Sequence, residues 1–167
     1  MPFRSARRFT SSRSAEWLRS PALGVSERGE SKVKAQLIES EDEHHWVLLD
    51  HRVTQLVIDR ASIRIQTWSL DGSADIRLAA PFVSQLANGS TRTIDPRDTE
   101  RLAPCLALVG LGVRSVTVSR VGTLTLAFSD GTTFTAPPDP RQSAWDVQGG
   151  GVLEGMAYAG EPGVELW

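Results

Sequence analysis

Cysteine is almost missing from this sequence, and long apolar runs are missing altogether. Cys105 is the one cysteine in 167 residues, so no internal disulfide can form and packing must hold the fold together. The longest apolar runs, such as residues 106–109, are far shorter than the roughly 20 residues of a membrane-spanning helix. The N-terminal arginines are not followed by the apolar stretch of a secretory signal peptide. We therefore expect a cytoplasmic protein with no membrane segment.

Charge is distributed unevenly along the chain, although the net charge is only −2. Residues 1–36 carry eight Lys or Arg against three Glu, whereas residues 37–167 have a net charge of −7. The sequence predicts a disordered Arg/Ser-rich tail at 1–36 and a single domain at 37–167, because a chain of this length buries one core of ordinary size. Such a tail can touch nucleic acid weakly, but inert disorder is the commoner outcome, so nucleic acid is not the expected partner.

Two similar segments lie about 60 residues apart. Each has two runs in which apolar and polar residues alternate, which is the period of half-buried strands. Each then reaches an Asp-Gly pair and a third alternating run, which predicts a hairpin with a type I′ turn. The matching positions favour an internal duplication into two three-stranded meanders, with Trp68 and Phe128 as core residues at nearly equivalent positions. The meanders span Val53–Leu78 and Val113–Ala136, and their Asp-Gly pairs are Asp71-Gly72 and Asp130-Gly131.

A short helix is predicted between the two meanders. Asp95-Pro96 supplies an N-cap residue followed by proline at the first helical position, and Gly110 supplies a stop. Pro104 should kink this helix or split it, and Leu102, Leu106 and Val109 are expected on its buried face. Further short strands are expected near residues 144–147, 153–158 and 164–167. The predicted fold class is mainly β (α+β): two duplicated antiparallel meanders forming a sandwich or partly open barrel, bridged by one short Pro-interrupted helix.

The second half of the chain resembles a family of small, chiefly actinobacterial domains with no assigned function. The resemblance covers roughly residues 46–167 and rests on short motifs: Phe128-Ser129-Asp130-Gly131-Thr132, Pro137-Pro138-Asp139, Ala144-Trp145 and Gly163-Val164-Glu165-Leu166-Trp167. The family commonly has Tyr-Glu-Ala-Trp-Glu where this chain has Gln-Ser-Ala-Trp-Asp at residues 142–146. The resemblance implies a bacterial cytoplasmic protein and carries no activity over to it.

No group of residues in the sequence predicts catalysis, a metal site or a cofactor. His44 and His45 are adjacent, so on a strand they point to opposite faces and cannot both bind one ion, and His51 is too far from His45 without a bend. Cys105 has no histidine in its half of the chain to activate it, so it is interpreted as a packing residue. The carboxylates at Glu39, Glu41, Asp42 and Glu43 are interpreted as a solvated charge run.

The leading functional hypothesis is a non-enzymatic protein-binding module that recognises a basic protein, with an immunity-like role as one form of it. The net charge of residues 37–167 is negative, and charge complementarity speeds association. Tryptophan is favoured at binding hot spots, so the candidate contact residues are Trp145, Asp146, Glu165 and Trp167.

The alternative is a small-molecule or anion-binding domain, or a small enzyme, with a pocket between the two repeats. Arg60 and Arg120 occupy matching positions of the repeats and are the candidate anion ligands. Arginines at strand ends are more often simply exposed to solvent. The oligomeric state stays open.

Overall fold

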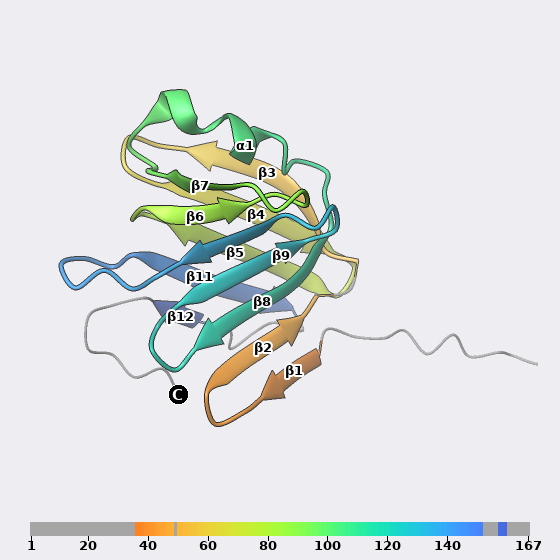
Figure 1. Cartoon of the computed structure of the whole chain (residues 1–167). Coiled ribbons are helices and arrows are strands. Elements are labelled where there is room, and N and C mark those ends of the chain that lie inside the picture. The colour runs from red at the N-terminus through yellow and green to blue at the C-terminus, as the bar shows by residue number, and fades with distance from the viewer. Residues whose placement is uncertain (1–35, 49, 152–156, 160–167) are drawn as a thin grey trace, which may run out of the picture. The chain divides into compact units, whose positions relative to one another are not determined.

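The computed structural model describes residues 36–48, 50–151 and 157–159. In this part of the chain the strands form two antiparallel sheets, one of seven strands and one of five, that do not close into a barrel (Figure 1). The predicted mainly β class is therefore confirmed. The elements in chain order are β1 (Gln36–Glu39), β2 (Glu43–Val47), β3 (Arg52–Ile58), β4 (Ile63–Ser69), β5 (Gly72–Leu78), β6 (Phe82–Gln85), β7 (Thr91–Ile94), a 3₁₀ turn (Thr99–Arg101), α1 (Ala103–Leu106), β8 (Val113–Ser119), β9 (Leu124–Phe128), β10 (Thr133–Ala136), β11 (Trp145–Gly151) and β12 (Ala157–Ala159).

The two meanders are present, one in each sheet, and each is followed by a hairpin that joins the opposite sheet. The five-stranded sheet has the order β12-β11-β5-β4-β3, so the hairpin after β10 adds to the first meander. The seven-stranded sheet has the order β1-β2-β8-β9-β10-β6-β7, so the hairpin after β5 adds to the second. Both sheets thus contain a five-strand unit of the same order. The β1–β2 hairpin extends one of these units.

Backbone irregularities recur at the same place in both five-strand units. The pairing of β3 with β4 shifts between Val53 and Gln55, and that of β8 with β9 shifts between Val113 and Ser115, 60 residues later. Each shift marks a β-bulge, which bends and twists the strand locally. The backbone has positive φ at Asp50 (61°) and again at Gly110 (90°), also 60 residues apart.

Trp68 is not a core residue, contrary to the sequence prediction. Val53 pairs with Thr67, whereas Val113 pairs with Phe128, so Thr67 rather than Trp68 is the counterpart of Phe128. Ile63, Ile65 and Thr67 point into the core on alternate positions of β4, which places Trp68 on the outer face. Its side chain is 55% exposed.

The two Asp-Gly hairpins form, but the predicted type I′ turns do not. Among the described residues neither Gly72 nor Asp130 has positive φ, and that turn needs positive φ at both central residues. Gly131 has φ of 89° and closes a three-residue loop, in which the Phe128 amide donates to Thr132 O at 2.9 Å. This is the hairpin with a G1 bulge, where glycine accepts the left-handed position without strain.

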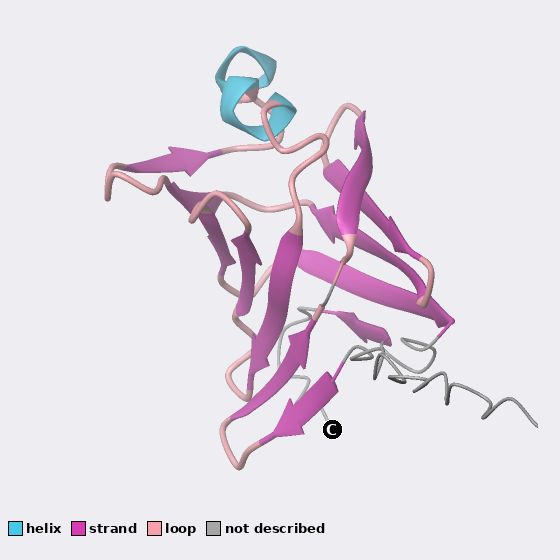
Figure 2. Cartoon of the chain, turned by 90° about the vertical axis from the view of Figure 1, so that its right-hand side faces the viewer, coloured by secondary structure: helices cyan, strands magenta, loops and turns pink. Residues whose placement is uncertain are grey.

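The predicted helix is split as expected, but its buried face differs from the prediction. A 3₁₀ turn over Thr99–Arg101 precedes α1, in which Pro104 occupies the first turn, where no amide hydrogen is needed. Cys105 is buried, whereas Leu106 and Val109 are 58% and 53% exposed. In the segment of the 3₁₀ turn and α1, buried positions recur every three residues, a spacing typical of tight turns rather than of a regular α-helix. In Figure 2 this segment lies at one end of the two sheets.

One hydrophobic core lies between the sheets and receives side chains from both. Its fully buried side chains include Phe82, Phe128 and Phe134 from the seven-stranded sheet and Ile65, Ile76 and Trp145 from the five-stranded sheet. The predicted tail, apart from Gln36, lies outside the described residues, as do Glu165, Trp167 and the strand expected at 164–167. No helix of the described chain is long and apolar enough to cross a membrane.

Candidate functional site

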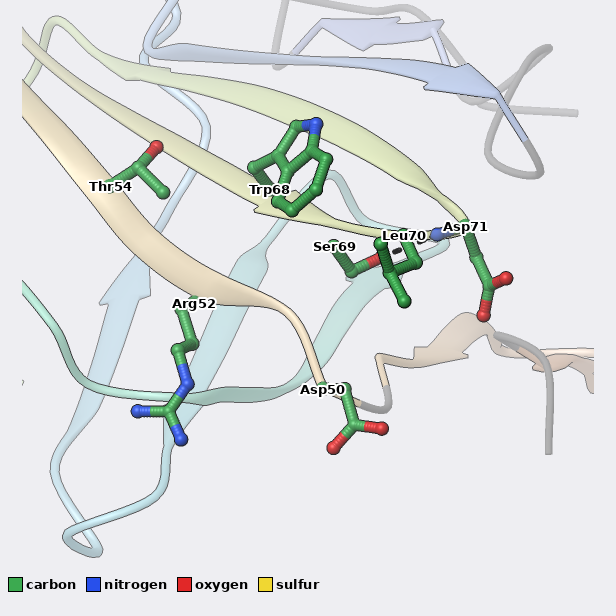
Figure 3. Close-up of a pocket in the computed structure, with 7 residues that line it drawn as sticks. All are labelled: Asp50, Arg52, Thr54, Trp68, Ser69, Leu70 and Asp71. Carbon is green, nitrogen blue, oxygen red and sulfur yellow. Dashed lines mark hydrogen bonds between the residues drawn. The ribbon is translucent and has the colours of Figure 1, made fainter. Parts of the chain in front are cut away.

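Two cavities meet at the point where equivalent segments of the two units cross. We call this place the seam. The first cavity has a volume of about 330 Å³ and the second about 640 Å³, and both are lined by Asp50 and Arg52. Figure 3 shows the first cavity. Besides the two shared residues, the first is lined by Thr54, Trp68, Ser69, Leu70 and Asp71, and the second by Val47, Leu48, His51, Gly110, Leu111, Gly112, Val113, Arg114 and Ser129.

The seam is built from reciprocal backbone hydrogen bonds. The Val53 amide donates to Leu111 O at 2.9 Å, and the Val113 amide donates to His51 O at 2.8 Å. Moving each residue of one bond to its counterpart in the other unit, 60 positions away, gives the other bond. Arg52 and Gly112, themselves 60 positions apart, form an isolated antiparallel bridge between the two bonds. The segment containing Arg52 is therefore held rigidly against the segment containing Gly112, and side chains of both units are brought to one place.

Asp50 adopts a backbone conformation that most residues avoid. Its φ of 61° lies in the left-handed region, which aspartate accepts more readily than most side chains but at some cost. Its counterpart 60 residues later is Gly110, which accepts the same conformation without that cost. Such a residue is kept where the surrounding structure fixes it, and functional sites are one place where this happens.

His51 lies beneath the seam and joins it to the β4–β5 turn. Its side chain is buried, with Nε2 at 3.0 Å from Ser69 Oγ and Nδ1 at 3.4 Å from Thr67 Oγ1. Burial lowers the pKa of His51, because desolvation disfavours the imidazolium, and the Asp71 carboxylate opposes this effect only in part. His51 is therefore neutral at neutral pH, and its ring connects the seam to Ser69 and Thr67 by hydrogen bonds.

Replacing His51 by glutamine is expected to remove a pH dependence of stability. Because the folded pKa lies below the ordinary 6.5, the unfolded chain takes up a proton at a pH where folded His51 stays neutral. The free energy of unfolding of the wild type should therefore fall below about pH 6.5, by at most about 1.4 kcal/mol per pH unit, and level off below the folded pKa. Urea unfolding between about pH 7.5 and 5.5 measures this slope, and the His51→Gln protein should lack it.

Asp59 also makes stability depend on pH, but in a pH range separate from that of His51. The hydrogen bond from the Ser62 side chain and that from the Ala61 amide lower the pKa of Asp59 from 3.8. Its contribution to stability is present above its unfolded pKa and is lost only as the pH falls through lower values, outside the His51 window. An unchanged slope in His51→Gln would contradict the role given to His51.

An exposed apolar patch lies beside the first cavity. Trp68 is the last residue but one of β4 and lies on its outer face, and Leu70, in the β4–β5 turn, is 81% exposed. The Asp71 amide donates to Ser69 Oγ at 3.1 Å and fixes this turn. In Figure 3 the carboxylates of Asp50 and Asp71 lie at the rim, while the Arg52 side chain points away from Trp68. We call Asp50, Trp68, Leu70 and Asp71 the Trp68 surface.

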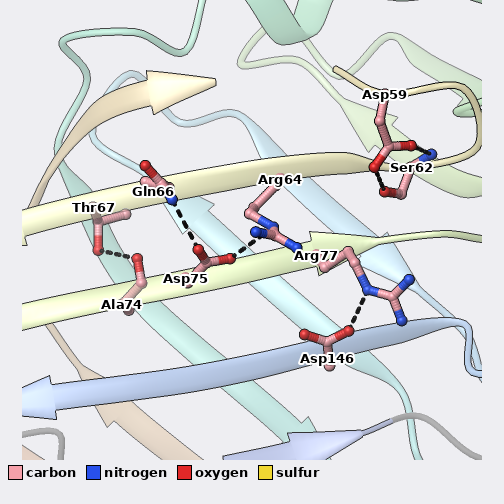
Figure 4. A network of polar contacts seen from close by, with 9 residues as sticks. All are labelled: Asp59, Ser62, Arg64, Gln66, Thr67, Ala74, Asp75, Arg77 and Asp146. Atoms are coloured by element: carbon pink, nitrogen blue, oxygen red, sulfur yellow. Dashed lines mark hydrogen bonds and ion pairs between the residues drawn. The ribbon is translucent and has the colours of Figure 1, made fainter. Parts of the chain in front are cut away.

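Charges on the neighbouring outer face of the five-stranded sheet are mutually paired (Figure 4). Asp75 accepts a hydrogen bond from Gln66 Nε2 at 2.9 Å and lies 3.4 Å from Arg64 Nε. Arg77 donates to Asp146 across the β5–β11 pair. Within the described residues, by contrast, Asp50 and Asp71 belong to no salt bridge with Arg or Lys. Because the lining of the first cavity holds these two carboxylates and one guanidinium, that of Arg52, the charge beside the Trp68 surface is net negative.

Of the residues predicted to contact a partner, the structure describes Trp145 and Asp146, and neither belongs to the Trp68 surface. Trp145 is fully buried, and its indole N–H donates to Gly122 O at 3.0 Å, so its side chain belongs to the core and not to a surface. Asp146 is paired with Arg77. Glu165 and Trp167 lie outside the described residues.

Arg60 and Arg120 lie in turns at the ends of β3 and β8, in different sheets, and both are exposed. Arg120 lines a cavity with the acidic turn of the β1–β2 hairpin, and Arg60 is not among the residues of that cavity. The predicted pocket between the repeats has a counterpart in the second cavity. Its arginines are Arg52 and Arg114.

The three histidines do not gather around one point. His45 is 2.7 Å from Thr117 Oγ1 on β8, His44 lies on the opposite face of β2 near Glu39, and His51 is in the seam. In the described chain no three His, Cys, Asp or Glu side chains are grouped as metal ligands. Burial raises the pKa of the Cys105 thiol to about 12, which keeps it protonated and unreactive.

The pair of Ser69 and His51 has the residue types of a nucleophile and a base. Both side chains are buried, and Ser69 Oγ already accepts the Asp71 amide. Ser69 lines the first cavity, but its Oγ is already engaged by the His51 ring and by the Asp71 amide, which fix the β4–β5 turn. The pair is therefore structural.

The fold and the seam define a class of protein: a two-sheet antiparallel β protein whose five-strand units exchange hairpins and cross at a pair of cavities. The model described as "Family of unknown function (DUF6188)" matches residues 44–163, and the chain belongs to that family. The predicted membership of a family without an assigned function is thereby confirmed. Comparisons with curated proteins and with solved structures found no match.

Proposed function

We propose that this protein is a non-enzymatic protein-binding module that docks a basic partner on the Trp68 surface. The observation that carries the proposal is the exposure of Trp68 and Leu70 next to two carboxylates without a cationic partner in the described chain. Tryptophan is the residue type most enriched at binding hot spots, and large exposed side chains that lie together mark interaction sites.

Rigidity of the surface supports this proposal. Trp68 lies in a strand whose neighbours Arg52 and Ser73 are fixed by backbone pairing, and Leu70 lies in a two-residue turn held by Ser69. A pre-ordered surface loses little conformational entropy when a partner binds, so more of the contact energy appears as affinity. A loop of the same composition would bind more weakly.

Charge supports the choice of a basic partner. Residues 37–167 have a net charge of −7, and Asp50 and Asp71 place part of it at the rim of the apolar patch. A basic partner would be steered to this rim, and salt would slow its association. A neutralising, immunity-like role in the bacterial cytoplasm fits such a partner. The recurring bulges favour an origin of the two units by duplication.

Affinity of a purified pair tests the proposal. The protein carrying an affinity tag is used to capture partners from its own cells, and each captured protein is then purified and titrated separately by calorimetry. Trp68→Ala should weaken binding by at least about tenfold, because a hot-spot truncation costs more than about 1.4 kcal/mol. Affinity should also fall as salt is raised.

Val121→Ala is the matched control. Val121 is 76% exposed and lies in the β8–β9 turn, outside both seam cavities. This variant should bind like the wild type. Equal affinities of wild type and Trp68→Ala, or the absence of any partner that binds as a purified protein, would refute the proposal.

A further inference from the structure

We infer that the second seam cavity binds a small organic anion, with a carboxylate or phosphate group held by Arg52 and Arg114 and an apolar body held by the cavity wall. The inference goes beyond the proposed function: the two cavities share Asp50 and Arg52, but a protein partner on the Trp68 surface does not require a ligand in the second cavity. The inference rests on the shape of the cavity, on the state of its two arginines and on the way its wall is fixed.

The cavity has the size and position of a ligand site. Its volume of about 640 Å³ lies within the range that accommodates small ligands, and it lies between two structural units, where such sites are common. Val47 and Leu111 are partly exposed in its wall and give it an apolar portion. The charged side chains of its lining are those of Arg52, Arg114 and Asp50.

Each arginine is anchored to the main chain and is not neutralised by an acid of the described chain. Arg52 Nη1 donates to Gly110 O at 3.3 Å, and Arg114 Nη2 donates to Ser129 O at 3.0 Å. Arg64, Arg77 and Arg101 differ, since each forms a salt bridge with an aspartate. A guanidinium has five N–H donors, so most donors of Arg52 and Arg114 remain for a ligand. Their forked geometry matches carboxylate and phosphate oxygens.

The wall between the arginines is fixed by Gly112 and Ser129. The Gly112 amide donates to Ser129 Oγ at 3.0 Å, and the Ser129 amide donates to Gly112 O at 2.8 Å. A Cβ atom on residue 112 would lie 3.3 Å from Ser129 Cβ, so glycine permits this close approach. The two main-chain oxygens that hold the arginines therefore keep a constant separation. Arginines held in this way lose little conformational entropy when they bind one anionic group together.

The charge of the cavity favours an anion although the body of the protein is acidic. The lining contains two guanidinium groups and one carboxylate, that of Asp50, so its charged side chains sum to +1. Both arginines are exposed, so a ligand would reach them directly from solvent. A cation would meet two like charges in this cavity.

A nuclear magnetic resonance titration of the ¹⁵N-labelled full chain tests the inference. Phenyl phosphate and benzoate should shift the signals of residues 110–114 and the side-chain Nε–H signals of Arg52 and Arg114 in a saturable manner. Inorganic phosphate should bind at least about tenfold more weakly than phenyl phosphate, because it lacks the apolar body. Arg114→Gln should weaken binding of phenyl phosphate by at least about tenfold.

Two further variants keep the result interpretable. Arg92→Gln changes an exposed arginine of β7 outside the seam and should leave binding unchanged. Trp68→Ala removes the protein-docking anchor and should also leave it unchanged, so this test can fail while the proposed function holds. Binding that Arg114→Gln does not weaken, shifts confined to residues that do not line the second cavity, or equal affinities for inorganic and phenyl phosphate would overturn the inference.

Discussion

Replacing Trp145 by alanine is expected to lower the free energy of unfolding by about 3–5 kcal/mol, as large-to-small changes at buried aromatic positions do. Trp145 begins β11, the strand that the second half of the chain contributes to the five-stranded sheet. Its side chain is fully buried, and its indole N–H reaches Gly122 O in the turn before β9 of the other sheet. The substitution therefore opens a cavity and leaves a carbonyl oxygen without its donor.

Trp145→Phe separates these two effects. It keeps an aromatic ring but loses the hydrogen bond, so a smaller loss of about 1–2 kcal/mol is expected. Chemical unfolding followed by circular dichroism measures both variants. A loss below about 1 kcal/mol for Trp145→Ala would show that the side chain is not buried between the sheets.

Replacing Phe134 by alanine is expected to cost a similar amount, about 3–5 kcal/mol. Phe134 lies in β10 between two other rings, with its centroid 4.9 Å from that of Phe82 and 5.3 Å from that of Phe128. Phe82 belongs to β6, which the first half of the chain contributes to this sheet, and Phe128 belongs to β9. Phe134 thus joins the exchanged hairpin to the meander that receives it.

Phe134→Leu is the control for volume, since it retains most of the apolar side chain and should cost about 1–1.5 kcal/mol. A double-mutant cycle of Phe134→Leu with Phe82→Leu should give a coupling energy of about 0.5–1.5 kcal/mol, the value of an aromatic pair. Strict additivity of these two changes would contradict the contact between β10 and the exchanged β6. Equilibrium urea unfolding of the four proteins provides the numbers.

Alternation in the sequence predicted the meanders because each strand is half-buried. Ile63 and Ile65 in one unit and Leu124 and Leu126 in the other are all buried, as their spacing indicates. The alternation of apolar and polar residues does not indicate which sheet a strand joins, since the alternation of β11 would fit pairing in either sheet. The exchange of hairpins therefore could not be read from the sequence.

Short or highly charged strands were missed for a related reason. Phe82–Gln85 and Thr91–Ile94 have four residues each, too few to establish a period, and the carboxylates around the β1–β2 turn obscure its strands. The predicted turn type was wrong at Asp130-Gly131, because an Asp-Gly pair fits both a two-residue loop and the end of a three-residue loop. Local sequence alone does not choose between them.

Ligand binding between the two repeats stays a prediction, and the residues that line the second cavity were not those chosen from the sequence. The seam between the two units was expected to contain a pocket, and the second cavity lies there. Arg60 and Arg120 were chosen because they match in the repeats, whereas Arg52 and Arg114 do not occupy equivalent positions. Trp68 was assigned to the core because the repeats were aligned one residue out of step after the bulge. The alternation of Ile63, Ile65 and Thr67 was the signal that places it outside.

Photo-crosslinking in cells tests most directly whether the Trp68 surface is the docking surface. A photoreactive amino acid, p-benzoylphenylalanine, is introduced in place of Leu70 in one protein and in place of Val121 in another, both exposed positions in hairpin turns. After irradiation, a discrete adduct with a basic protein is expected from position 70 and not from position 121. When the protein with the photoreactive residue at position 70 also carries Trp68→Ala, that adduct should disappear. The absence of an adduct from position 70, or equal adducts from both positions, would contradict the proposed docking surface.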